Sequence, residues 1–232
     1  MTPVDVVIPA FNAQAFLDEA MDSVLMQGAW IGKIVVVDDG SSDATAAIAA
    51  ARGAPIEVVQ LPQNRGISAA RNAGLVRCTA DFVAFLDADD RWLPGKLTIQ
   101  MAAITSVPDC AFVLCRVRPF ADERLPAEER TALLSQQPAF VDGWMASALV
   151  ARRSLFAQAG DFAEDLRVGE AIDWFSRVRS LAHVIVPEVL VERRMHRHNT
   201  TRLATEQRRD YLLAAHRHLV RQRNAGGGGD RR

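Results

Sequence analysis

Short apolar runs alternate with amphipathic stretches through the first hundred residues of the chain. Runs rich in Val and Ile, typical of buried β-strands, occupy residues 4–8, 33–37, 56–61 and 82–86. The stretches between them place apolar side chains at helical spacing over residues 13–26, 43–51 and 67–77. Strands that are apolar throughout and alternate with helices predict a parallel sheet covered by helices, with right-handed crossovers.

After residue 94 the pattern is less regular. We expect helices over residues 94–106, 154–158, 171–180 and 203–223, and strands over residues 110–117, 148–151, 184–186 and 189–191. Three prolines interrupt the charged stretch 118–142, which we interpret as a mobile excursion with one short helix at 127–134. The predicted fold class is α/β: a single domain with a largely parallel central sheet flanked by helices, plus a C-terminal helix.

Polar clusters directly follow the predicted strands of the first half. They occupy residues 9–12, 38–42, 64–66 and 87–90. In open parallel sheets, ligands bind beyond the carboxyl ends of the strands, and all four clusters fall at that rim. The pattern therefore predicts one binding site built from several loops.

The most informative of these clusters is Asp87-Ala88-Asp89, which ends the apolar run 82–86. A strand buried on both faces cannot hold carboxylates, so they must lie just past its end. Residues two apart in an extended chain point to the same side, where two carboxylates would repel each other. A hard divalent cation such as Mg²⁺ or Mn²⁺ relieves that repulsion. Taken alone, the pattern is equally that of a polar loop.

Composition narrows the class of protein. The 232 residues are 49% hydrophobic and 24% charged, as expected of a soluble globular chain. The net charge of −1 argues against nucleic acid as the main partner. Three cysteines without C-x-x-C spacing, no visible secretion signal and no run of about 20 apolar residues lead us to expect a cytoplasmic protein.

Charge is distributed unevenly along the chain. Residues 193–232 contain eleven arginines and three acidic residues, a charge of +8, which leaves −9 for the rest. Leu212, Ala215 and Leu219 share one face of the predicted terminal helix, with arginines on the other. Such a helix would pack on the acidic body of the domain, or make peripheral contact with an anionic membrane.

Five motifs in succession resemble the family 2 glycosyltransferases of the GT-A fold. They are Val-Ile-Pro-Ala-Phe-Asn12, Val-Val-Asp-Asp-Gly-Ser-Ser42, Asn64-Arg-Gly66, Ala-Arg-Asn-Ala-Gly74 and Phe-Leu-Asp-Ala-Asp-Asp90. Each motif is weak alone, but their order and spacing match the family over roughly the first 100 residues. The later half resembles the family more loosely, through Gly160-Asp-Phe162, Gly169-Glu170 and Arg194-Met-His196.

The resemblance implies an inverting transfer of sugar from a nucleotide diphosphate donor, most directly a UDP-sugar, to the hydroxyl of a glycan, lipid-linked or peptide acceptor. It assigns residues 1–106 to nucleotide-sugar binding, 107–202 to the acceptor side and 203–224 to a C-terminal helix of one domain, followed by a flexible tail at 225–232. Two alternatives stay open. One is a nucleotidyltransferase, although residues 9–12 lack the glycine and lysine expected of it. The other is a sugar-nucleotide-binding protein without turnover.

Nine residues match positions at the nucleotide in this family. They are Pro9, Ala10, Phe11, Asn12, Asp39, Gly66, Arg71, Asp87 and Ala88. The resemblance makes Asp39 the acceptor of a hydrogen bond from the uracil ring N–H, and places Asp87 at the ribose or at a metal-bound water. The alternative roles are a helix-initiating turn at residues 9–12, a helix cap at Asp39 and a surface ion pair at Arg71.

Asp89 and His196 match positions at the metal. Asp89 corresponds to the direct ligand of a divalent cation, Mg²⁺ or Mn²⁺. His196 corresponds to a histidine near the metal or the diphosphate, where neutral imidazole is a suitable ligand. The alternative for His196 is a solvated basic turn, since arginines flank it on both sides.

The candidate general base departs from the family pattern. The family usually has adjacent Glu-Asp at the start of a helix, with the Asp as base, but Ala171 occupies that position here. Glu170 and Asp173 are three residues apart and therefore share a helix face. We favour Glu170, because the helix N-terminus stabilises its ionised carboxylate. Asp173 is the alternative base, unless it pairs with Arg177 four residues on.

Overall fold

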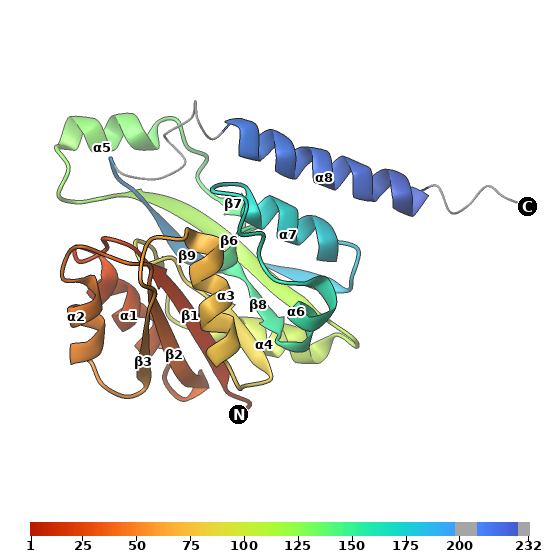
Figure 1. Cartoon of the computed structure of the whole chain (residues 1–232), viewed down its shortest axis with the longest axis horizontal. Helices are drawn as coiled ribbons and strands as arrows, with labels where there is room; N and C mark the ends of the chain where they lie inside the picture. The colour runs from red at the N-terminus through yellow and green to blue at the C-terminus, as the bar shows by residue number, and fades with distance from the viewer. Residues whose placement is uncertain (198–207, 227–232) are drawn as a thin grey trace, which may run out of the picture.

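A single mixed β-sheet with helices on both faces forms the body of the protein (Figure 1). The computed structural model describes residues 1–197 and 208–226. The strands are β1 (Val4–Ala10), β2 (Ile31–Asp38), β3 (Ile56–Gln60), β4 (Phe82–Phe85), β5 (Arg91–Trp92), β6 (Phe112–Ala121), β7 (Val141–Asp142), β8 (Val150–Arg152) and β9 (His183–Met195). Their order across the sheet is β3-β2-β1-β4-β8-β6-β9-β5, with β7 paired to β6 beside this path.

The helices connect and cover these strands. They are α1 (Leu17–Leu25), α2 (Thr45–Ala51), α3 (Ile67–Arg77), α4 (Lys96–Ser106), α5 (Ala127–Leu134), α6 (Ser154–Ala159), α7 (Glu170–Val178) and α8 (Arg208–Gly226), with 3₁₀ turns η1 (Gly28–Trp30) and η2 (Ala146–Ala148). Strands β3, β2, β1 and β4 run parallel, as the apolar runs predict. All seven residues of β1 are buried, because both faces of the strand are covered.

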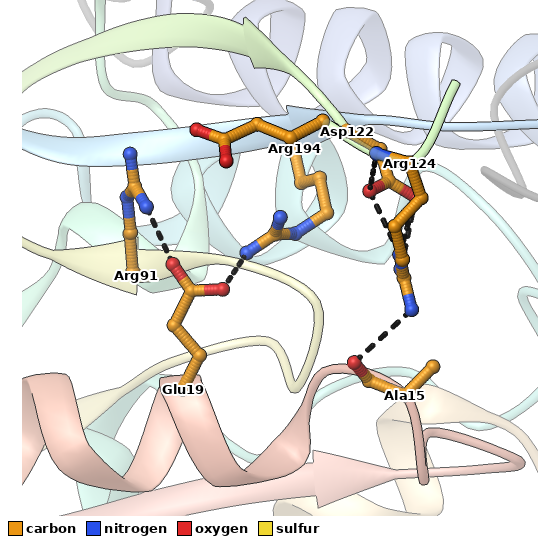
Figure 2. A pocket seen from close by; sticks show the side chains of 7 residues that line it. Ala15, Glu19, Arg91, Asp122, Arg124 and Arg194 are labelled. Carbon is orange, nitrogen blue, oxygen red and sulfur yellow. Dashed lines mark hydrogen bonds and ion pairs between the residues drawn. The ribbon is translucent and has the colours of Figure 1, made fainter. Parts of the chain in front are cut away.

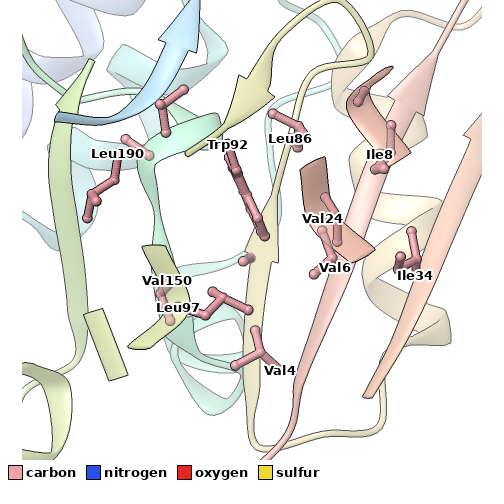
Figure 3. Close-up of a cluster of buried hydrophobic side chains, with 14 of the residues drawn as sticks. Val4, Val6, Ile8, Val24, Ile34, Leu86, Trp92, Leu97, Val150 and Leu190 are labelled. Atoms are coloured by element: carbon pink, nitrogen blue, oxygen red, sulfur yellow. The ribbon is translucent and has the colours of Figure 1, made fainter. Parts of the chain in front are cut away.

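Each face of the sheet carries its own hydrophobic cluster. One cluster joins β1 and β4 to α1 and α4 and contains Val6, Val24 and the buried indole of Trp92 (Figure 3). On the opposite face, α3 packs closely on β1. A Cβ at Gly74 would come within 2.3 Å of a Val7 methyl carbon, so the glycine of the Ala-Arg-Asn-Ala-Gly74 motif permits this contact. The close packing fixes the position of α3, the helix that bears Arg71.

The second half of the sheet mixes strand directions. Strand β8 runs antiparallel to both β4 and β6, whereas β9 runs parallel to β6. The predicted excursion at residues 118–142 is wrong at both ends. Residues 118–121 continue β6 and pair with β9 as far as Ala121↔Met195, and Val141–Asp142 forms β7 against β6. The short helix expected at residues 127–134 is present as α5.

The terminal helix packs on the body of the domain. Figure 1 shows α8 lying along α7, and an ion pair of 2.6 Å joins Arg217 to Asp165. The predicted helix start, residues 203–207, and the tail at 227–232 lie outside the described residues, and α8 itself continues to Gly226. Among the helices in residues 1–197 and 208–226, none is long and apolar enough to cross a bilayer.

Candidate active site

Two rim loops are tied together by Asn12. Its backbone N–H donates to the Ser41 hydroxyl, and its side-chain oxygen accepts from the Ser42 N–H, both at 2.9 Å. Pro9 and Ala10 end β1 opposite Val37 and Asp38 of β2. The Phe11 ring that follows is 48% exposed. Residues 9–12 therefore form a fixed ledge with an aromatic ring open to solvent.

Asp39 holds a third loop at this rim. Its two carboxylate oxygens accept from the backbone N–H groups of Arg65 and Gly66, each at 2.8 Å. Gly66 has φ +95° and opens α3, a conformation that favours glycine. Asp43, not Asp39, accepts from the Thr45 N–H at the start of α2. The helix-cap alternative for Asp39 therefore does not apply.

Arg71 joins two carboxylates from distant parts of the chain. Its guanidinium is 2% exposed and donates to Asp87 at 2.6 Å and to Glu170 at 2.7 Å. Burial opposes the charged form, but Asp87 and Glu170 together raise the pKa of Arg71. This is a buried double ion pair, so the surface-pair alternative is wrong. The Arg71 guanidinium thus contacts both Asp87, the first Asp of the D-x-D motif, and Glu170, the candidate base.

The three acidic residues after β4 have different surroundings. Burial raises the pKa of Asp87, with Asp89 adding to the rise and Arg71 opposing it. Asp90 is turned into the protein, where it accepts from the Arg194 N–H at 3.0 Å and the Ser147 hydroxyl at 3.2 Å. Ala88 is buried in the hydrophobic cluster beneath. Asp87 and Asp89 thus remain at the rim while Asp90 anchors the turn.

Asp89 and His196 meet although 107 residues separate them. The imidazole Nε2 lies 2.9 Å from an Asp89 carboxylate oxygen, and the Phe16 ring packs on the imidazole at 4.8 Å between centroids. The side chain of His196 is 8% exposed, so the solvated-turn alternative is wrong. Among the residues that the structure describes, no cluster of three or more His, Cys, Asp or Glu side chains has the geometry of a metal site.

A charged brace, formed by Arg194, Glu19 and Arg91, supports the segment that bears Asp89. Arg194 donates to the Asp89 carbonyl at 2.9 Å and forms an ion pair with Glu19 of α1. The same Glu19 carboxylate pairs with Arg91 at 2.5 Å (Figure 2). Sequence reasoning missed Glu19 and Arg91, because a charged residue on the polar side of a surface helix or beside a turn carries no signal of its partner. In the sequence, only the motif Arg194-Met-His196 indicated that this segment belongs to the site.

The two candidate bases face different surroundings. Glu170 begins α7 and points to Arg71 at the rim. Asp173 is 2% exposed and pairs with Arg221 of α8 at 2.9 Å and with Arg177 at 3.3 Å. The structure therefore brings Glu170, but not Asp173, next to Asp87.

Comparison with known proteins identifies the family. Residues 5–156 match the family model of Glycosyl transferase family 2. The chain belongs to glycosyl transferase family 2. Within this family it is 33% identical over 129 residues to the putative teichuronic acid biosynthesis glycosyltransferase TuaG of Bacillus subtilis. That match covers 54% of this chain and 51% of TuaG. It is 31% identical over 188 residues to the succinoglycan biosynthesis protein ExoO of Rhizobium meliloti, covering 72% and 53%. The chain thus spans about half the length of these two relatives.

Solved glycosyltransferases of this fold superpose on most of the chain. S. aureus TarS 1–349 in complex with UDP-GlcNAc gives a TM-score of 0.74 at 19% identity, covering 96% of this chain and 67% of that one. The mannosyltransferase PcManGT of Pyrobaculum calidifontis, in complex with GDP-Man and Mn²⁺, gives 0.69 at 18% identity, covering 93% and 64%. The predicted family and the GT-A-like α/β fold are confirmed.

Proposed function

We propose that this chain is an inverting glycosyltransferase that uses a UDP-sugar and a divalent cation. The observation that carries the proposal is the double ion pair of Arg71, which holds Asp87 of the D-x-D motif and Glu170 at one buried guanidinium. Donor and acceptor must meet within a few ångströms, and a shared contact with Arg71 would keep the donor-side Asp87 and the base Glu170 that close. The remaining site residues would bind the nucleoside and the cation.

The nucleoside would bind on the ledge formed by residues 9–12. Phe11 offers an exposed ring, and Asp39 offers carboxylate oxygens that each hold one backbone N–H already. A carboxylate accepts about four hydrogen bonds, so capacity remains for a uracil ring N–H. Neighbours of the same fold are solved with UDP-GlcNAc in one case and GDP-Man in another, so the base preference rests on Asp39.

Asp89 and His196 fit a divalent cation. The Asp89 carboxylate and the His196 imidazole, whose nearest atoms lie 2.9 Å apart, would hold it. Carboxylate oxygen and neutral imidazole are both accepted by Mn²⁺. When bound, the cation supplies Lewis-acid stabilisation of the charge that develops on the leaving diphosphate. Asp87 is held by Arg71 and would act indirectly.

Glu170 would accept the proton of the acceptor hydroxyl. Arg71 binds its Oε1, and among the described residues no hydrogen-bond partner is found for Oε2. As that proton moves to Glu170, the acceptor oxygen forms a bond to the anomeric carbon. The bond from that carbon to the diphosphate oxygen breaks on the opposite side, and the diphosphate leaves with the electron pair. A single displacement of this kind inverts the anomeric configuration.

The alternative of a binding protein without turnover rests on Ala171, which replaces the usual Asp. A direct test is a thermal-shift screen of sugar nucleotides with and without Mn²⁺, followed by measurement of UDP release with and without simple sugar acceptors. Ligands that bind the folded state raise its melting temperature by mass action. Release of UDP would support the enzyme. Tight, Mn²⁺-dependent UDP-sugar binding with no release under any acceptor would favour the binding protein, and no nucleotide binding at all would overturn both.

A further inference from the structure

Helix α8 turns its charged side toward the domain. Arg217 pairs with Asp165 at 2.6 Å, and Arg221 pairs with Asp173 at 2.9 Å and donates to the Ser176 hydroxyl at 2.5 Å. A surface helix ordinarily packs its apolar stripe on the core and turns its charges to water. In α8, Ala214 packs on the domain in this way, but two leucines lie on the outward side.

The outward side of α8 is apolar and basic. Leu212 is 66% exposed and Leu219, two turns later, is 53% exposed on the same side. Ala215 and His216 between them are exposed, as is Arg209 near the start of the helix. Exposed leucines within a basic surface are typical of helices that lie in a membrane interface.

The charge of the whole molecule favours one occupant for this surface. In the sequence, residues 208–226, which form α8, contain five arginines and one aspartate, a charge of +4, whereas the rest of the chain carries −5. A second copy docking here would bring two basic helices face to face, and like charges would oppose the contact. An anionic bilayer attracts the basic surface and repels the acidic remainder, so it also fixes which side of the molecule approaches.

The same helix is seated beside the candidate base. Gly169, which immediately precedes Glu170, has φ +78°, and a Cβ built on it would lie 3.4 Å from Tyr211 and 3.4 Å from Ala214. The Arg167 N–H donates to the Asp210 carboxylate at 2.8 Å. The inward side of α8 is therefore packed against the segment that leads into Glu170.

We propose that the outward face of α8, defined by Leu212, Ala215 and Leu219, docks on anionic phospholipid bilayers. The leucines enter the headgroup–acyl boundary while the arginines meet lipid phosphates. A consequence that rests on the proposed function is the acceptor class: a hydroxyl on a lipid-linked saccharide, which a bilayer bound to α8 would present to the domain.

The test is flotation of the full chain with vesicles of phosphatidylcholine alone or with about 30% phosphatidylglycerol. We expect binding to the anionic vesicles, little binding to the neutral ones, and weakening by salt. The double variant Leu212→Gln/Leu219→Gln should lower the partition coefficient about tenfold or more. The matched control is Met26→Gln/Val76→Gln, which removes two exposed apolar residues elsewhere, at 63% and 81% exposure, and should bind as wild type does.

A second variant guards against loss of folding. Ala215→Asp should weaken binding and Ala215→Arg strengthen it, with both melting temperatures near that of wild type. Equal binding by wild type and the leucine variant, or no binding to anionic vesicles, would overturn the proposal. A dimer in light scattering that Leu212→Gln/Leu219→Gln dissociates would also overturn it, in favour of a second copy. UDP-sugar binding without vesicles should be the same in wild type and in all these variants. If wild type binds anionic vesicles but no UDP-sugar, the proposed function fails while the docking proposal stands.

Discussion

Single residues in the candidate site have their charges set by partners far away in the sequence. Arg71 is the clearest case, because it has one carboxylate from the strand-end motif and one from α7 within 2.7 Å. Removing one partner of a buried ion pair leaves the other uncompensated. Substitutions at Asp87 or Glu170 therefore change both chemistry and stability, so thermal melts must accompany the kinetics even of isosteric variants.

Asp89→Asn tests the cation site. The amide keeps the size of the side chain but removes the charge opposing a divalent ion, so Mn²⁺-dependent stabilisation by UDP should be lost and UDP release should fall below detection. Differential scanning fluorimetry with and without Mn²⁺ measures the first effect. Asp87→Asn is the matched variant and should do less, since Asp87 faces Arg71. Normal Mn²⁺ dependence in Asp89→Asn would exclude this residue as a ligand.

Glu170→Gln and Asp173→Asn separate the two candidate bases. The first should reduce turnover by about 10²–10⁴-fold, the usual contribution of a positioned base, with UDP-sugar affinity nearly unchanged. The second should mainly lower the melting temperature, because Asp173 is buried between Arg177 and Arg221. Steady-state kinetics and thermal melts on both variants decide the matter. The reverse ranking of turnover would assign the base to Asp173.

At the scale of elements, the first half of the sheet could be predicted because each strand is buried on both faces. The helix at residues 67–77 has the predicted ends, and so does the helix at 127–134. The continuation of β6 beyond residue 117 could not be predicted, since Arg118 and Pro119 look unsuited to a strand. Arg118 is tolerated because Glu192 of the neighbouring strand β9 pairs with it. The rim of the sheet could be predicted because polar loops directly follow its strands. The brace between Glu19 and Arg194 could not be predicted, because the two residues are 175 apart in the sequence.

Helix α4 begins with a lysine that should cost stability. Lys96 is fully buried, its Nζ has no hydrogen-bond partner among the described residues, and the Trp92 ring lies 4.0 Å from it. Burial lowers the pKa of Lys96 from 10.5 to about 8. The difference corresponds to up to roughly 3 kcal/mol of destabilisation, which contact with the indole face reduces. We expect Lys96→Met to be more stable than wild type at pH 7 in urea unfolding.

The pH dependence of that difference gives a second measurement. Below pH 8 both native and unfolded wild-type chains hold the Lys96 proton, so the full penalty is present. Between pH 8 and 10.5 the unfolded chain still holds the proton that the native chain has released, and wild-type stability rises relative to the variant. The advantage of Lys96→Met should therefore shrink over that interval. A constant advantage would mean that Lys96 does not titrate there.

At the scale of the whole molecule, the rim links elements that also hold the sheet together. Asn12 ties β1 to the loop after β2, and Asp39 ties the end of β2 to the start of α3. A ligand bound across these loops stabilises the whole fold rather than one segment. The free energy of unfolding rises by RT ln(1 + [L]/Kd), about 2.7 kcal/mol at a hundred times Kd. Nucleotide choice can therefore be measured as global stability.

We expect UDP to stabilise the protein more than GDP at equal concentration in the presence of Mn²⁺. The diphosphate and cation contacts are common to both nucleotides, so the difference reports on the base alone. In the proposed site Asp39 would accept the uracil N–H, and two backbone N–H groups already fix its carboxylate, so little ordering would be needed on binding. Uridine and guanosine, which lack the diphosphate, are the matched controls and should keep the same order at weaker binding. Equal stabilisation by UDP and GDP would remove the basis for a UDP-sugar donor while leaving the roles of Asp89 and Glu170 to be judged by their own variants.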